Sequence, residues 1–155
     1  MNLRRRAREL ALQALFQFDM QGEAFTAELD AFLEQSCDND EVRRFARLLA
    51  EGTWQHRQQA DALLGRLTVR WSVDRMAVTD RNILRMGIFQ LAHCPDIPPR
   101  VVINEAIELG KRYSTADSPQ FINGLLDAAR KNAECGIRNA ELKKPETQGE
   151  GGGEK

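Results

Sequence analysis

This chain of 155 residues is predicted to form an all-α domain of six or seven helices joined by short loops. Apolar residues recur at steps of three and four along most of the chain, and no segment alternates apolar and polar residues for long. Prolines and glycines separate these helical stretches. The composition, 42% hydrophobic and 29% charged, is typical of a globular protein, and the length suits one domain with a real core.

Two helices are predicted in the first 35 residues. The first runs from about Leu3 to Asp19, and Gly22 ends it. The second covers roughly Ala24 to Gln35, with its aromatic and leucine side chains facing inward. The apolar stripe of the first helix consists of Leu3, Ala7, Leu10, Ala14 and Phe18.

The third predicted helix is long. Apolar residues stay near one face from Val42 to Leu67, and Asp38 or Asp40 is expected to cap its start. Gly52 lies in the middle of this stretch. We expect it either to bend the helix or to let another helix approach closely.

The next helix is predicted to follow an irregular link that contains Trp71. It begins near Asp74 or Thr79 and continues to His93. Its buried face is expected to hold isoleucine and leucine side chains at helical spacing.

Prolines divide the remaining sequence into two further helices. Pro99 suits the first position of a helix that reaches Tyr113. Ser118 followed by Pro119 repeats this start signal with a hydroxyl cap and a fixed φ angle. The helical pattern fails from about Cys135, so we expect a domain over residues 1–134 and a disordered tail over residues 135–155.

Positive charge is concentrated at the N-terminus. The whole chain has a formal net charge of -1 and a pI of about 6.2, so no global field would attract a nucleic acid. A cluster of four arginines faces only Glu9 within the first eighteen residues. The cluster consists of Arg4, Arg5, Arg6 and Arg8.

The three cysteines do not form a recognisable framework. Cys37, Cys94 and Cys135 are odd in number and lack CxxC spacing, which argues against structural disulfides and a zinc site. Reduced thiols in a cytoplasmic protein are the simple interpretation. Polar residues interrupt the apolar stretch after the arginines, so neither a signal peptide nor a membrane span is predicted.

One side of the first helix combines charge with an aromatic ring. Arg5, Arg8, Leu12 and Phe16 follow one another at steps of three and four. Guanidinium groups neutralise phosphates and a ring stacks on an unpaired base, so this side suits RNA. In the alternative interpretation, Leu12 and Phe16 pack on a second layer while the arginines are only solvated.

Phe121 suggests a second part of the same surface. It lies in the first turn of its helix, where unpaired backbone N–H groups favour phosphate. Lys111 and Arg112 end the preceding helix nearby in the sequence. The alternative is that Phe121 is an aromatic residue at the edge of the core.

Catalytic chemistry is not indicated. No histidine stands at a spacing typical of an acid–base pair from Glu9, Glu105 or Glu108. We therefore interpret these three residues as solvated helix carboxylates. No phosphate loop, metal-ligand cluster or activated nucleophile is recognisable, so no enzyme, cofactor or metal is predicted.

Four motifs in order give the chain a resemblance to a bacterial family, NusB. They cover about Leu3 to Lys131 and comprise Arg6-Ala7-Arg8-Glu9 with Ala11, Gln13, Ala14 and Leu15; Asp80-Arg81 with Ile83-Leu84-Arg85; Ile97-Pro98-Pro99 with Ile103-Asn104-Glu105-Ala106 and Glu108-Leu109; and Phe121-Ile122-Asn123-Gly124-Leu125-Leu126-Asp127. Each is weak alone, and their order and spacing make the set specific. Gly110 and Gln90 stand where the family often has alanine and glutamate.

The resemblance implies an all-helical fold of two small packed bundles and a role in transcription antitermination. Family members bind the single-stranded boxA element of nascent RNA together with the ribosomal small-subunit protein NusE, and help RNA polymerase read through terminators in ribosomal RNA operons. By this resemblance the helix starting near Asp80 would meet the protein partner, with Asp80 and Arg81 in contact. The residues that we expect to face RNA are Arg4, Arg5, Arg6, Arg8, Gln13, Phe16, Arg112 and Phe121.

Two other functions remain open at this point. An RNA cytosine methyltransferase can carry a similar domain at its N-terminus, but it needs a cofactor-binding domain downstream of it. A structural helical homodimer is the other alternative, because some family members self-associate and dimerisation would bury the RNA face.

Overall fold

The computed structural model describes residues 2–68 and 72–143, and it confirms the predicted all-α fold. Helix α1 spans Leu3–Gln21. The side chain of Asn2 caps its start by accepting a hydrogen bond from the Arg5 backbone N–H at 3.0 Å. Gly22, with a φ of 70°, ends it as the sequence predicts.

The second predicted helix is divided into two elements. A 3₁₀ helix, η1, covers Gly22–Glu28, and helix α2 covers Leu29–Ser36. The 3₁₀ turn brings Phe25 edge-on to Phe18 of α1, with 5.0 Å between the ring centroids. Aromatic packing therefore joins this segment to the core of the first three helices.

The single long third helix predicted from the sequence is wrong. The structure has α3 over Asp40–Gln55 and α4 over Arg57–Leu67, with the break at His56. Polar side chains bond the carbonyls of the last turn of α3: His56 Nδ1 lies 2.9 Å from Gly52 O, and Arg57 Nη1 donates to Trp54 O at 2.6 Å. These bonds satisfy carbonyl groups that have no partner within the helix where it ends. Asn39, rather than either predicted aspartate, caps α3.

Helix α5 spans Val78–His93 and lies at the centre of the molecule. Its start agrees with the predicted site near Thr79, while Asp74 lies in the short 3₁₀ helix η2, Val73–Arg75. Every residue from 82 to 90 is buried, which explains why α5 carries several polar side chains bonded inside the protein. Trp71 of the predicted link lies outside the described residues.

The last two helices form an antiparallel pair. Helix α6 spans Pro99–Tyr113 and begins at its proline, as predicted. Helix α7 spans Ser118–Lys143, so the helical backbone continues beyond the predicted end near Cys135. The proposed tail beyond Lys143 lies outside the described residues, and the division at residue 135 stays a prediction.

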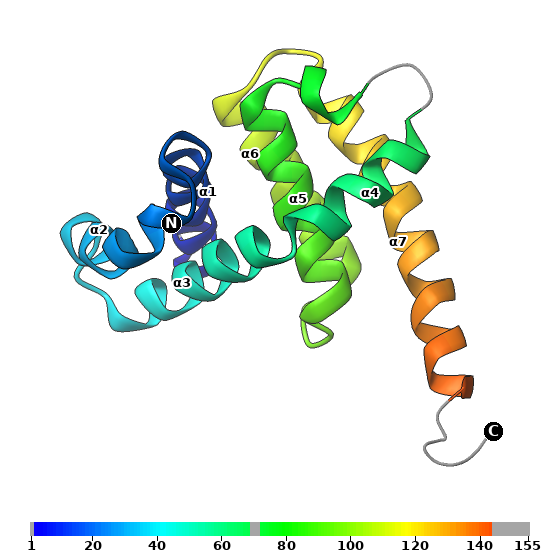
Figure 1. The fold of residues 1–155 in the computed structure, drawn as a ribbon, viewed down its shortest axis with the longest axis horizontal. Coiled ribbons are helices and arrows are strands. Elements are labelled where there is room, and N and C mark those ends of the chain that lie inside the picture. The colour runs from blue at the N-terminus through cyan, green and yellow to red at the C-terminus, as the bar shows by residue number, and fades with distance from the viewer. Residues whose placement is uncertain (1, 69–71, 144–155) are drawn as a thin grey trace.

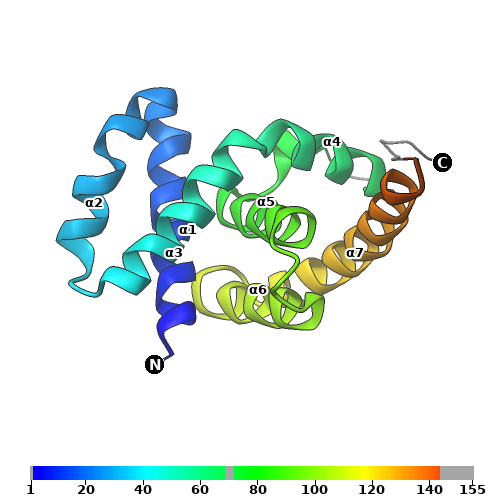
Figure 2. The ribbon, with the colours of Figure 1, turned by 90° about the horizontal axis from the view of Figure 1, so that it is seen from below.

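The described helices gather into two bundles, as Figures 1 and 2 show. Helices α1 to α3 form one bundle, and α4 to α7 form the other. Helices α1 and α3 both pack against α5, so α1 lies at the junction and is buried on more than one side. None of the helices in the described part of the chain is long and apolar enough to cross a membrane.

Candidate nucleic-acid interface

The predicted arginine cluster occupies the first two turns of α1, but its members have different environments. Arg4 is exposed, and Arg5 and Arg6 are partly exposed. Arg8 is only 3% exposed, so the prediction that it faces RNA is wrong for the structure described here. The reason is that α1 lies at the junction of the two bundles, where Arg8 contacts Gln90 of α5 and Phe45 of α3.

Arg8 is held by partners from both bundles. Its Nε donates to Oε1 of Gln90 on α5 at 3.1 Å, and its guanidinium lies 5.3 Å from the Phe45 ring centroid on α3. Burial lowers the pKa of Arg8, although an arginine stays charged. Arg4 covers the same ring, with its guanidinium 4.1 Å from the Phe45 centroid. Phe45 is thus a packing site for two arginines.

Arg5 leans toward the second bundle and pairs with Glu105 of α6. Its Nε and Nη2 donate to the two carboxylate oxygens at 3.0 and 2.9 Å, which is a bidentate ion pair. The hydrogen bond from Arg5 is the main cause that holds the pKa of Glu105 below its ordinary value. The prediction that Glu105 is a solvated carboxylate is therefore wrong.

A second ion pair joins the same two helices. Arg112 of α6 pairs with Glu9 of α1, whose side chain is 4% exposed. Arg6 also approaches Glu9, with 3.7 Å between Nη1 and Oε1, and donates to Ser36 O at 3.4 Å. Glu9 is therefore a buried anchor for two arginines, not the solvated carboxylate predicted from the sequence.

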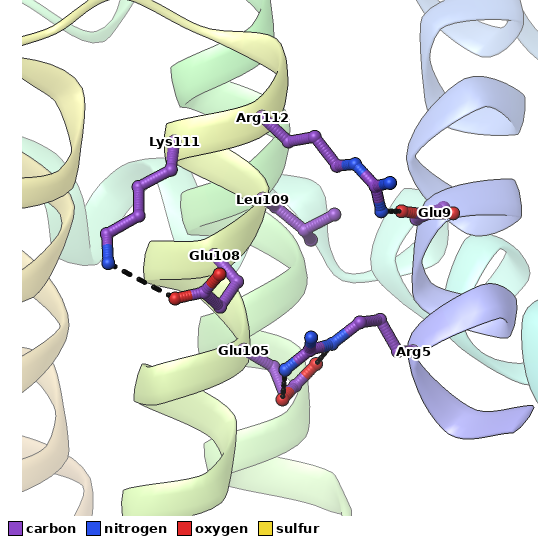
Figure 3. A pocket seen from close by; sticks show the side chains of 7 residues that line it. All are labelled: Arg5, Glu9, Glu105, Glu108, Leu109, Lys111 and Arg112. Carbon is purple, nitrogen blue, oxygen red and sulfur yellow. Dashed lines mark hydrogen bonds and ion pairs between the residues drawn. The ribbon is translucent and has the colours of Figure 1, made fainter. Parts of the chain in front are cut away.

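Between these two ion pairs lies a groove of about 500 Å³, which we call the arginine groove. Figure 3 shows Arg5 and Glu9 reaching from α1 toward the α6 side chains, with Leu109 between them. The lining residues are Arg5, Glu9, Glu105, Glu108, Leu109, Lys111 and Arg112. Three of these side chains carry guanidinium or ammonium groups, the kinds of group that contact backbone phosphates.

Exposed rings lie beside the arginine groove. Phe16 is 46% exposed and Tyr113 is 42% exposed, and both line a small hollow together with Gln13. Glu9 lines both this hollow and the arginine groove, so the two adjoin at Glu9. We call Gln13, Phe16 and Tyr113 the aromatic patch. Tyr113 is the last residue of α6 and lies at the surface.

Phe121 lies in a different groove. It is half-buried and lines a hollow of about 310 Å³ with Arg75, Thr115, Asp117 and Ser118. Asp80 also lines this groove, and the preceding residue, Thr79, lines the hollow of the aromatic patch. The predicted strip is therefore two adjacent hollows, not one continuous row of charge and rings.

Asp80, predicted to contact a protein partner, is satisfied inside the chain. It is 9% exposed and accepts hydrogen bonds from Ser114 Oγ at 2.6 Å and Ser118 Oγ at 3.0 Å. These bonds fix the turn between α6 and α7 to the start of α5. A free carboxylate for a partner is not offered at this position.

Arg81 belongs to a polar junction between the bundles. Its Nη2 lies 3.7 Å from Asp19 Oδ2 on α1, and Asn82 donates to the same oxygen at 2.8 Å. Arg85 lies 3.5 Å from Asp19 and pairs with Asp61 of α4 at 2.6 Å. Because the Arg81 side chain is 17% exposed, only its edge is available to a partner.

The structure thus brings five of the predicted RNA residues to the junction of α1 and α6: Arg4, Arg5, Gln13, Phe16 and Arg112. Sequence reasoning missed the roles of Glu9, Glu105 and Tyr113. No spacing rule pairs Arg5 with a residue one hundred positions away. The pair forms because α1 lies beside α6 in the folded protein, and the sequence alone does not indicate this.

Comparisons with known proteins show which family the chain belongs to. A family model described as the NusB family matches residues 5–131. The transcription antitermination protein NusB of Symbiobacterium thermophilum is 45% identical over 131 residues, covering 79% of this chain and 86% of that protein. The protein of the same name from Myxococcus xanthus is 46% identical over 131 residues, covering 82% of this chain and 94% of the relative.

Solved structures give the same result. NusB of T. maritima superimposes with a TM-score of 0.71 at 37% identity, covering 83% of this chain and 90% of that one. A crystal structure of antitermination factors NusB and NusE in complex with double-stranded RNA matches with a TM-score of 0.75 at 26% identity. It covers 85% of this chain and 98% of the matched chain.

Proposed function

This chain belongs to the NusB family of transcription antitermination proteins, and we propose that it binds the single-stranded boxA element of nascent RNA through the junction of α1 and α6. A protein that acts in this way binds without turnover. The relatives that match over most of their own length are antitermination proteins, which favours this function over an RNA-binding module of a methyltransferase.

One observation carries the RNA proposal: the arginine groove and the aromatic patch adjoin at Glu9. Arginine and lysine side chains neutralise backbone phosphates, and exposed rings stack on splayed bases. Phe16 is too exposed to serve the core, and an amide at Gln13 beside it is suited to a base edge. Single-stranded RNA uses both kinds of contact.

The proposed protein partner is the ribosomal small-subunit protein NusE. Support comes from the matched structure that contains NusB, NusE and RNA. We place the contact at the start of α5 and the neighbouring Phe121 groove, where the edge of Arg81 and the exposed Val78 lie. Together the two would join the RNA polymerase antitermination complex in the cytoplasm.

Two adjacent binding surfaces would explain cooperation. Because the aromatic patch and the Phe121 groove adjoin through Thr79 and Asp80, RNA and protein would bind side by side. A bound partner then raises the effective concentration of the RNA at its own surface. RNA binding in the presence of the partner should be tighter than the binding of RNA alone.

The test is fluorescence anisotropy with a labelled boxA RNA, with and without NusE, over a series of salt concentrations. We expect the affinity to fall with salt and to fall further in Arg112→Ala. A scrambled RNA of equal length is the control for sequence preference. Equal affinity for both RNAs, or affinity that does not change with salt, would count against the proposal.

A further inference from the structure

The arginine groove is electrically balanced in the free protein. Its lining contains three basic side chains, Arg5, Lys111 and Arg112, and three acidic ones. Each basic side chain touches an acidic one: Lys111 lies 3.2 Å from Glu108, Arg112 contacts Glu9, and Arg5 contacts Glu105. A groove without net formal charge attracts a polyanion weakly. Something must therefore change before these arginines bind phosphate.

The Arg5–Glu105 pair occupies the donors that a phosphate needs. An arginine binds two phosphate oxygens through the same fork of parallel N–H groups that it offers to a carboxylate. In this protein, Nε and Nη2 of Arg5 already donate to the two oxygens of Glu105. The carboxylate thus stands where two phosphate oxygens would otherwise lie.

The two partners of this ion pair differ in their exposure to solvent. The side chain of Arg5 is 41% exposed, whereas that of Glu105 is 15% exposed and lies against α1. Arg5 therefore has room to turn toward solvent while Glu105 stays in place. Glu9 is less suited to exchange, because it is 4% exposed and Arg6 approaches it as well.

We infer that Glu105 is an internal competitor for RNA phosphate, which holds Arg5 in the free protein and lowers the affinity of this face for RNA. The inference rests on the proposed function. RNA binding then replaces the Glu105 carboxylate on Arg5 with a phosphate. The free energy needed to break the ion pair offsets part of the attraction between Arg5 and the phosphate. A protein partner that disturbs the pair would strengthen RNA binding without touching the RNA.

The test is Glu105→Gln, measured by anisotropy with boxA RNA. We expect the affinity to rise about threefold to tenfold, because exposed ion pairs are weak and one bidentate pair is removed. The slope of log affinity against log salt should change by less than about 0.7, because Arg5 contacts phosphate in both proteins and the variant adds no phosphate contact. A pair with a purely structural role would leave the affinity unchanged.

A matched control separates this effect from net charge. Asp30→Asn removes the same charge and also releases an arginine, Arg47 of α3, whose Nε lies 3.1 Å from Asp30. Helix α2 lies on the other side of α1 from α6, as Figure 2 shows. This variant should leave the affinity and the slope nearly unchanged. In the double variant Arg5→Gln/Glu105→Gln, the gain should disappear.

A measurement on the wild-type protein guards against misfolding of the variant. In spectra with ¹⁵N-labelled arginine, the Arg5 Nε–H signal should shift when boxA RNA is added. Three outcomes would each overturn the inference: an Arg5 signal that does not shift, an unchanged RNA affinity in Glu105→Gln, or an equal rise in affinity in Asp30→Asn. Salt-dependent RNA binding by the wild-type protein would still support the proposed function. If the wild-type protein does not bind boxA RNA at all, both fall.

Discussion

Gly52 of α3 lies directly against the ring of Phe89 of α5. A Cβ added at Gly52 would be 2.1 Å from the ring Cζ, a distance that real structures do not contain. This contact joins the first bundle to the central helix. Gly52 therefore serves close approach of two helices, as one of the two interpretations from sequence predicted, and the break in the helix occurs at His56.

We predict that Gly52→Ala destabilises the protein by about 1–3 kcal/mol, because overpacking forces the ring or the helices to move. Urea unfolding followed by circular dichroism measures the change. Gly65→Ala is the control, since no atom lies within 4 Å of a Cβ there and alanine favours the helix. Equal free energies of unfolding for the two variants would show that the close approach of α3 and α5 at Gly52 does not require a glycine.

Arg8 should act on stability and not directly on RNA. Arg8→Ala removes the stem that packs at the junction and leaves Oε1 of the buried Gln90 without its donor. We expect a loss of about 1–3 kcal/mol in the free energy of unfolding. Arg4→Ala is the comparison, because Arg4 also covers Phe45 but is exposed. Equal losses for the two variants would contradict the structural role of Arg8.

The burial of Arg8 shows what helical periodicity can and cannot predict. The spacing of apolar residues identified the buried stripe of Ala7, Leu10, Ala14 and Phe18 correctly, but Leu3 at its start is 46% exposed. It treated the opposite side as surface, because one helix's pattern does not say how many neighbours the helix has. Leu12 is 7% exposed on that side, which fits the alternative of a second packed layer.

Local signals predicted the limits of helices best where a proline or a glycine marks them. Pro99 begins α6, where its fixed φ suits the first turn. The division between α3 and α4 had no glycine or proline to mark it, and it depends on side chains of His56 and Arg57 bonding freed carbonyls. The site was harder to predict, because the partners of Arg5 and Arg112 come from the other bundle.

Acid should weaken the contact between α1 and α6. The Arg5 hydrogen bond depresses the pKa of Glu105 in the folded state, so the pair adds stability above the ordinary glutamate pKa. That contribution is lost as the pH falls through the depressed pKa, where the carboxylate is protonated even in the folded protein. Wild type should melt slightly higher than Glu105→Gln at neutral pH, and the difference should vanish in acid.

Thermal melts of both proteins between pH 7 and pH 3 measure this effect. Only the difference between the two proteins is informative, because other carboxylates also titrate over this range. Asp30→Asn is again a suitable comparison. A difference between wild type and Glu105→Gln that persisted unchanged into acid would show that the pair does not stabilise the junction through its charge.

Phe16 should contribute to RNA binding and little to folding. Its ring is 46% exposed, so Phe16→Ala should change the free energy of unfolding by less than about 0.5 kcal/mol. Stacking of one base on an aromatic side chain contributes about 1–3 kcal/mol, so the affinity for boxA RNA should fall about fivefold or more. Met20→Ala provides the control, because Met20 lies one turn further along α1 and is 68% exposed. Tighter or unchanged RNA binding in Phe16→Ala would remove the aromatic patch from the interface and leave the arginine groove to bind the backbone alone.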